Sequence, residues 1–262
     1  SDPVDPSRDP ERPFLEHLDE LQRRLKSSLL VVVAGMVVAG FAFKPLAGIV
    51  EGQLRDAYQA VGHPEDFPTS LVSLSPTDTV GLVFKFALAG GLFLALPLLL
   101  VQLWGFASPA LRGQERRVAG WLVAAGPIFF VGGFLFSFFK VLPLTAECLL
   151  SVSYYYGFVP RWTAESYFSF FLILNLAFGA CFELPLVMVI LSVLGLAGPA
   201  TFARYRRHWV VASFVIGGFL PPPEVISMFV QAAALIALYE VGILTSRLLV
   251  TRKPSLQSQG QG

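Results

Sequence analysis

Long uncharged runs rich in apolar residues recur along the chain. The first, residues 27–43, holds 17 uncharged residues, which reach about 26 Å as a helix. Later runs cover residues 86–111, 118–139, 166–203 (interrupted once, by Glu183), 209–220 and 225–239. Because the hydrocarbon core of a bilayer is about 30 Å thick, this pattern predicts six transmembrane helices. The fifth run has only 12 residues and reaches about 18 Å, so we expect the last two helices to form a short hairpin.

The composition also indicates a membrane protein. Hydrophobic residues make up 55% of the 262 residues, charged residues only 14%, and the mean hydropathy is +0.65. A soluble domain usually carries about 25% charged residues, so this chain has too little polar surface to face water. We therefore predict an all-α polytopic membrane protein.

Several function classes are unlikely on the same grounds. A net charge of +1 leaves no basic face for a nucleic acid. Cys148 and Cys181 lie 33 residues apart without a nearby partner cysteine, and the histidines lie outside the middles of the apolar runs, which argues against metal, redox and haem sites. The sequence carries no HExxH, GxSxG or phosphate-loop motif. We expect no cofactor and no enzymatic activity.

The positive charges predict the orientation in the membrane. The N-terminal segment, the segments around Arg112 and Arg204, and the C-terminal tail together hold 14 of the 19 lysines and arginines. The opposite loops hold only Arg55 and Arg161 outside the span ends. Because positive residues are retained on the cytoplasmic side, both termini should be cytoplasmic.

The chain divides into a transmembrane domain with polar ends. We predict a cytoplasmic tail with an amphipathic helix at residues 1–26, the six-span domain at 27–246, and a largely disordered cytoplasmic tail at 247–262. The helix is either a solvated lead-in to the first span or a surface that offers carboxylates to a basic partner. Polar loops are expected after residue 43 and at 143–165.

Two acidic residues are predicted on the cytoplasmic face. Glu20 lies in the amphipathic helix, and Glu115 lies among the arginines between the second and third spans, close to Phe106. The arginines there are explained as anchors, but an acid works against the local positive field. Together, Glu20 and Glu115 could hold a pair of cations.

Glu183 is the most informative residue, because it lies about 17 residues into the fourth run. An ionised carboxylate near the bilayer centre costs several kcal/mol, so it should be protonated or paired, and such acids are functional candidates. Gly179 and Ala180 should clear space for another helix, water or a bound segment, and Pro185 should bend the helix.

The motifs that surround these residues resemble those of one family. The opening FLEHLDELQRRL is similar to the EHLxELRxRL start of TatC, the multispanning core subunit of the twin-arginine protein translocase. The resemblance continues in order through SPTDTVGLVFKF, the stretch from Pro97 to Gln102, Trp104-Gly105-Phe106 and PALRGQERR. It ends with FGACFELPLV around Glu183 and PPPEVIS. It covers nearly the whole chain.

The resemblance implies a receptor that recognises signal peptides with two consecutive arginines. Such a protein helps to export folded proteins across the inner (cytoplasmic) membrane, driven by the proton-motive force. Its expected partners are single-span TatA and TatB type subunits, twin-arginine precursors, other copies of itself and membrane lipid.

The resemblance also assigns roles to single residues. The predicted signal-peptide site comprises Glu20, Phe106, Glu115 and Arg24. Roles in partner docking inside the membrane fall to Glu183 and Pro185, and roles on the periplasmic side to Pro45, the proline after span one, and Glu224. Two positions depart from the family pattern: Gln22 replaces an arginine, for which Arg23 or Arg24 can substitute unless it is dispensable, and Glu224 replaces an aspartate.

Two alternatives remain open from the sequence. One is a small proton- or cation-coupled secondary transporter that uses Glu183, although no second embedded charge or broken helix is evident to face it. The other is an assembly scaffold without a peptide substrate.

Overall fold

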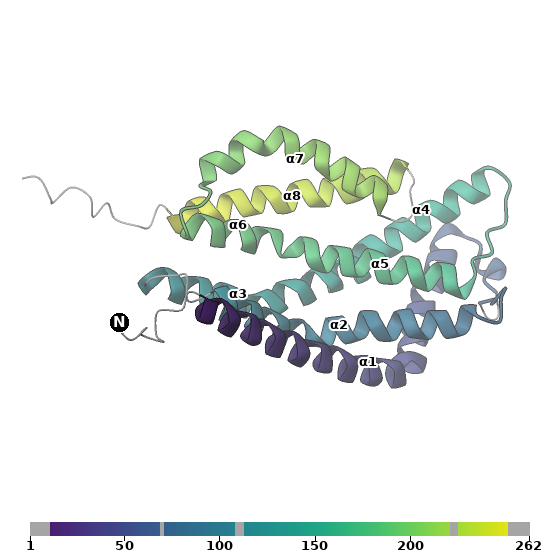
Figure 1. Cartoon of the computed structure of the whole chain (residues 1–262). Helices are drawn as coiled ribbons and strands as arrows, with labels where there is room; N and C mark the ends of the chain where they lie inside the picture. The colour runs from purple at the N-terminus through teal and green to yellow at the C-terminus, as the bar shows by residue number, and fades with distance from the viewer. Residues whose placement is uncertain (1–10, 69–70, 108–112, 221–224, 251–262) are drawn as a thin grey trace, which may run out of the picture.

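The computed structural model describes residues 11–68, 71–107, 113–220 and 225–250, with side chains described from residue 22 onward apart from 103–119, 226–227 and 249–250. The described chain is a helical bundle without strands (Figure 1). The elements are α1 (Glu11–Val61), η2 (Pro64–Asp66), α2 (Asp78–Ala107), α3 (Gly113–Phe136), η4 (Ser137–Val141), α4 (Leu142–Tyr155), α5 (Ala164–Phe182), α6 (Leu184–Val193), α7 (Pro199–Phe219) and α8 (Val225–Val250).

Five segments of the described chain are long and apolar enough to cross a membrane. They are Gln22–Val61, Asp78–Gln102, Gly120–Tyr155, Ala164–Val193 and Met228–Leu248. The fifth predicted span, at 209–220, lies in α7, where three arginines precede the apolar part. The all-α polytopic prediction is therefore confirmed.

The helices run between two ends of the bundle (Figure 1). One end carries the start of α1, the end of α2, the start of α3 and the connection from α6 to α7; we call it the N-terminal end. The other carries the connections from α1 to α2 and from α4 to α5; we call it the far end.

The polar stretch after the first predicted span, in which Leu54, Ala57 and Val61 have a helix-like spacing, is helical. Helix α1 continues through the exposed Pro45 to Val61, and its later part turns across the far end in Figure 1. A proline inside a helix removes one backbone hydrogen bond and bends the axis. Packing compensates, because Leu54, Ala57 and Tyr58 are each only 1% exposed. The helix-like spacing of apolar residues in this polar stretch was the signal for the extension.

The predicted loop at 143–165 is also largely helical. A π-helical turn, η4, joins α3 to α4 without a break. Pro143 follows this turn, where the regular hydrogen-bond pattern of the helix is already altered. Leu142, Ala146 and Leu150 are buried there, so tertiary packing outweighs the polar character of the segment.

The second half of the bundle differs from the predicted runs in its boundaries. The fourth run splits into α5 and α6 at Glu183, and the chain turns through Gly195 (φ +72°) before α7 begins at Pro199. Helices α7 and α8 have 21 and 26 residues, longer than the apolar runs that predicted them.

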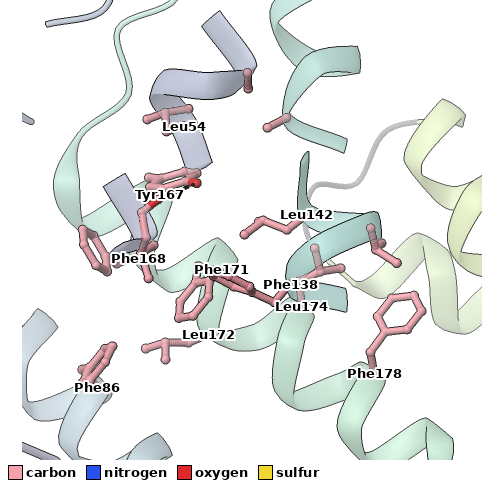
Figure 2. Close-up of a cluster of buried hydrophobic side chains, with 14 of the residues drawn as sticks. Leu54, Phe86, Phe138, Leu142, Tyr167, Phe168, Phe171, Leu172, Leu174 and Phe178 are labelled. Atoms are coloured by element: carbon pink, nitrogen blue, oxygen red, sulfur yellow. Dashed lines mark hydrogen bonds between the residues drawn. The ribbon is translucent and has the colours of Figure 1, made fainter. Parts of the chain in front are cut away.

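Aromatic side chains fill the core between α1, α2, α4 and α5. Figure 2 shows Tyr167, Phe168 and Phe171 of α5 beside Leu54 of α1 and Leu142 of α4. The Tyr167 hydroxyl donates to the Val50 carbonyl oxygen at 3.2 Å, which satisfies the one polar group of this ring inside the core.

A glycine seam brings α1 and α2 together. A methyl group on Gly91 would lie 2.6 Å from Met36 Cγ and 2.8 Å from the Val32 oxygen, and one on Gly35 would lie 3.0 Å from Gly91. Small residues allow such close backbone approach between membrane helices.

Candidate functional site

At the N-terminal end, polar contacts hold α1 against α2. The Arg24 guanidinium donates from Nη1 to the Gln102 carbonyl oxygen at 3.0 Å. The Ser28 hydroxyl donates to Gln102 Oε1, and Gln102 Nε2 donates to Ser27 Oγ at 3.4 Å. We call these four residues the α1–α2 clamp. It fixes the register of the two antiparallel helices where the signal-peptide site is predicted.

The α1–α2 clamp sets the register of the two helices on which Glu20 and Phe106 lie. Glu20 lies one helical turn before Arg24 on α1, and Phe106 lies one turn after Gln102 on α2. Because the helices are antiparallel, both residues lie beyond the clamp, toward the N-terminal end. Glu115 is the third residue of α3, which starts at the same end. The side chains of Glu20, Phe106 and Glu115 lie outside the described residues.

Gln102 ends one stretch of the family resemblance, but the sequence assigned it no role. A glutamine near the end of an apolar run is unremarkable by itself, and its partners are 74 to 78 residues away in the chain. Only the register of α1 against α2 reveals its role.

Glu183 lies at the break between α5 and α6. Its backbone is helical (φ −73°, ψ −17°), and Pro185 follows in the first turn of α6, so the predicted interruption of the helix is present. The side chain is partly buried, and Oε1 has no hydrogen-bond partner among the described residues. An unpartnered carboxyl oxygen in an apolar bundle is costly, which makes this atom a candidate acceptor or donor for a group from outside the chain.

Gly126 of α3 provides the space for this carboxyl group. A methyl group there would lie 3.3 and 3.5 Å from the two Glu183 oxygens and 2.7 Å from Leu100 Cδ1. Leu100 precedes Gln102 by two residues. The last turns of α2 therefore pack against α3 beside Glu183 and also carry Gln102 of the α1–α2 clamp.

Another helix of the same chain fills part of the space that Gly179 and Ala180 were predicted to leave beside Glu183. A methyl group on Gly179 would lie 2.9 Å from the Phe130 ring, so this glycine admits α3 rather than an external segment. Ala180 remains exposed. Gly133 of α3 similarly lies against Phe182 and the Phe178 carbonyl, and the two glycines bring α3 close to α5.

The two remaining predicted residues lie elsewhere. Pro45 is exposed inside α1. Glu224 lies outside the described residues.

The α7–α8 hairpin contains a buried polar residue, Gln231, that was not predicted. Gln231 is fully buried, and neither amide atom has a partner among the described residues. An uncharged polar residue in the sixth apolar run was the available signal, since such residues join membrane helices.

The comparisons with known proteins agree with one another. The family described as Sec-independent protein translocase protein (TatC) matches residues 16–233. The TatC of Aquifex aeolicus is 33% identical over 94% of this chain and 99% of its own length, and that of Escherichia coli K12 is 31% identical over 91% and 90%.

A solved structure of the same family is also similar in fold. A crystal structure described as the twin-arginine translocase receptor TatC superposes with a TM-score of 0.76 at 33% identity, covering 90% of this chain and 100% of that one. Sequence and fold thus agree over nearly the full length, and the chain belongs to the TatC family of Sec-independent protein translocase proteins.

Proposed function

We propose that this chain is the signal-peptide receptor and core subunit of a twin-arginine translocase. It exports folded proteins across the inner membrane, uses the proton-motive force, and has both termini in the cytoplasm. The observation that carries the proposal is the near full-length match to a twin-arginine translocase receptor. The α1–α2 clamp supports it, because it places Glu20 and Phe106 on neighbouring helix turns at one end of the bundle.

Recognition of two arginines requires carboxylates on separate elements. Glu20 on α1 and Glu115 on α3 each offer one carboxylate to a guanidinium, and charge-assisted pairs with arginine are strong and geometrically selective. Phe106 on α2 offers a ring to the peptide between them. Binding would therefore join α1, α2 and α3 at the N-terminal end.

Glu183 acts as a docking site rather than as a proton wire. Its unpartnered Oε1 accepts or donates a hydrogen bond to a polar group on a partner helix, which lipid cannot satisfy. The partners are single-span TatA and TatB type subunits or further copies of the chain, and Pro185 keeps the helix open beside the carboxyl group.

Export of a folded reporter with a twin-arginine signal peptide tests the proposal. The host strain lacks its own TatC and carries this chain with matched partner subunits. Glu20→Gln and Glu115→Gln should each lower export at least about tenfold, since each removes a charge-assisted pair of about 1.5–3 kcal/mol. Asp19→Asn, a neighbouring acid on the same helix, is the control and should export normally.

The alternatives give different results in the same strains. An assembly scaffold without a peptide substrate predicts normal export by the charge variants, and that outcome would refute the receptor. The secondary transporter predicts counterflow of a small solute in proteoliposomes that contain this chain alone. Membership of a protein translocase family favours the receptor over the transporter.

A further inference from the structure

The turn after α1 brings three potential metal ligands together at the far end. His63 Nδ1 lies 3.4 Å from Glu65 Oε1 and 3.7 Å from Asp66 Oδ2. All three ligand atoms lie within 4.8 Å of one another. Four consecutive residues, HPED, supply the whole group.

These separations suit a small divalent cation. In a tetrahedral zinc site with bonds of about 2.0–2.1 Å, neighbouring ligand atoms lie about 3.3 Å apart. The His63–Glu65 and His63–Asp66 distances are close to this value, so small side-chain rotations would complete the geometry. Three protein ligands leave the fourth position for water.

Backbone hydrogen bonds hold the turn in shape. Gly62 has a φ of +89°, and the His63 N–H donates to the Tyr58 oxygen at 3.0 Å, which forms a helix C-cap. The Asp66 N–H donates to the His63 oxygen at 3.2 Å, closing the following 3-10 turn. The ligand-bearing positions are therefore fixed before any ion binds, which lowers the entropy cost of binding.

Tyr154 of α4 orients two of the three ligands. Its hydroxyl donates to Asp66 Oδ2 at 2.9 Å, and its ring stacks on the His63 ring with centroids 3.9 Å apart and planes 17° apart. Outer groups that orient a carboxylate and an imidazole are a regular part of metal sites. An ion bound here would be held by the turn after α1, and this turn contacts α4 through Tyr154.

The cluster itself is rich in negative charge, while the Arg55 guanidinium lies over the neighbouring Phe67 ring, 5.0 Å from its centroid. Glu65 and Asp66 provide two carboxylates, and no lysine or arginine of the described residues forms an ion pair with either. An imidazole nitrogen with carboxylate oxygens suits zinc-type transition metals, whereas magnesium and calcium prefer oxygen ligands alone.

We propose that His63, Glu65 and Asp66 form a binding site for a divalent transition-metal cation of the Zn²⁺ type, which braces the far end of the bundle. This metal site is separate from the predicted signal-peptide site and from Glu183. It does not depend on the proposed receptor function.

Calorimetric titration of the purified full chain tests the proposal. The protein is prepared in detergent without a polyhistidine tag, stripped with a chelator and titrated with Zn²⁺ near pH 7. We expect one tight site per chain, weakened at least about tenfold in His63→Asn and in Glu65→Gln. His208→Asn on α7 and Asp56→Asn on α1 replace exposed residues outside the cluster and should bind Zn²⁺ like the unmodified chain.

Thermal unfolding supplies a second readout. Zn²⁺ should raise the melting temperature of the unmodified chain and of the two controls but not of the two ligand variants, because only a bound ion stabilises the folded state. All five proteins should melt alike in chelator, which shows that the ligand variants are folded. Absence of tight zinc binding, equal affinity in His63→Asn, or an equal shift with Mg²⁺ would each overturn the proposal.

Discussion

Gln102 connects α2 to α1 through both its backbone and its side chain. Its carbonyl oxygen accepts from Arg24, while its amide group bonds to Ser27 and Ser28. Arg24, which was predicted to contact the signal peptide directly, thus also has a structural contact. The arginine can hold the site in position as well as line it.

Replacing Gln102 with leucine should weaken the signal-peptide site without unfolding the chain. The substitution removes the amide contacts with Ser27 and Ser28 but keeps the carbonyl acceptor for Arg24. Two hydrogen bonds contribute about 1–2 kcal/mol, so the affinity for a twin-arginine peptide should fall about 5- to 30-fold. Titration of a labelled peptide measures this loss. Gln59→Leu, at the far end of α1, is the control; an unchanged affinity in Gln102→Leu would show that the clamp is irrelevant to binding.

Substitutions of Glu183 separate hydrogen bonding from proton transfer. Glu183→Gln keeps the shape and the hydrogen-bonding capacity of the side chain, so export should remain near normal. Glu183→Ala removes both and should abolish most export. Export of a twin-arginine reporter measures the two variants side by side. A glutamine variant as defective as the alanine variant would mean that the carboxyl group must titrate.

Single residues differ in how far the sequence reveals them. Glu183 was recognisable because an acid inside an apolar run requires an explanation. The family motifs indicated Glu20, Phe106 and Glu115, and the structure adds only their backbone positions. Gln102 and Gln231 could not be ranked in advance, because their importance comes from neighbours that are distant in sequence.

Helix packing at the element scale depends on particular glycines. Gly91 and Gly126 each lie where a methyl group would come within 3 Å of another helix, whereas Gly81 and Gly132 on the same two helices have nothing within 4 Å. The sequence does not distinguish these glycines, since the difference arises only from the interhelical register.

Gly91→Ala should destabilise the bundle. The added methyl group would meet the backbone of α1 at Val32 and Met36, and such overpacking costs about 1–3 kcal/mol. Gly81→Ala adds the same group in open space and should be neutral or slightly stabilising. Thermal unfolding in detergent compares the two variants, and equal melting temperatures would contradict the tight α1–α2 seam.

Gly126→Ala should disturb the surroundings of the Glu183 carboxyl group and leave the rest of the chain unchanged. A methyl group there pushes on Leu100 and on both carboxyl oxygens, so export should fall severalfold while signal-peptide affinity stays near normal. Gly132→Ala on the same helix is the control. Export and peptide affinity are measured in parallel for both variants. Normal export by Gly126→Ala would show that the space beside Glu183 is not needed for export.

Element boundaries were the least predictable feature. The uncharged run placed the first span at 27–43, and the polar residues of 143–165 suggested a loop. Packing of Leu54, Tyr58, Leu142 and Leu150 extends helices through both regions. The apolar face of such a segment is visible in sequence, but the core that it packs against is not.

The whole molecule is a bundle whose N-terminal end gathers the helices that carry the predicted receptor site. Composition alone predicted the membrane and the all-helical class, and the ordered motifs predicted the family. The relation between the sites could not be predicted. The last turns of α2 pack against α3 beside Glu183 and also carry Gln102 of the α1–α2 clamp, because Leu100 and Gln102 lie two residues apart.

Site-specific photocrosslinking of a twin-arginine signal peptide to this chain in membranes tests the receptor most directly. Probes placed beside Glu20 and Glu115 should crosslink to the peptide. The crosslinks should disappear with a twin-lysine peptide, and again in Glu20→Ala or Glu115→Ala, because lysine cannot form the bidentate pair and alanine offers no carboxylate. Crosslinks that persist through all of these changes would contradict recognition of two guanidinium groups at this site.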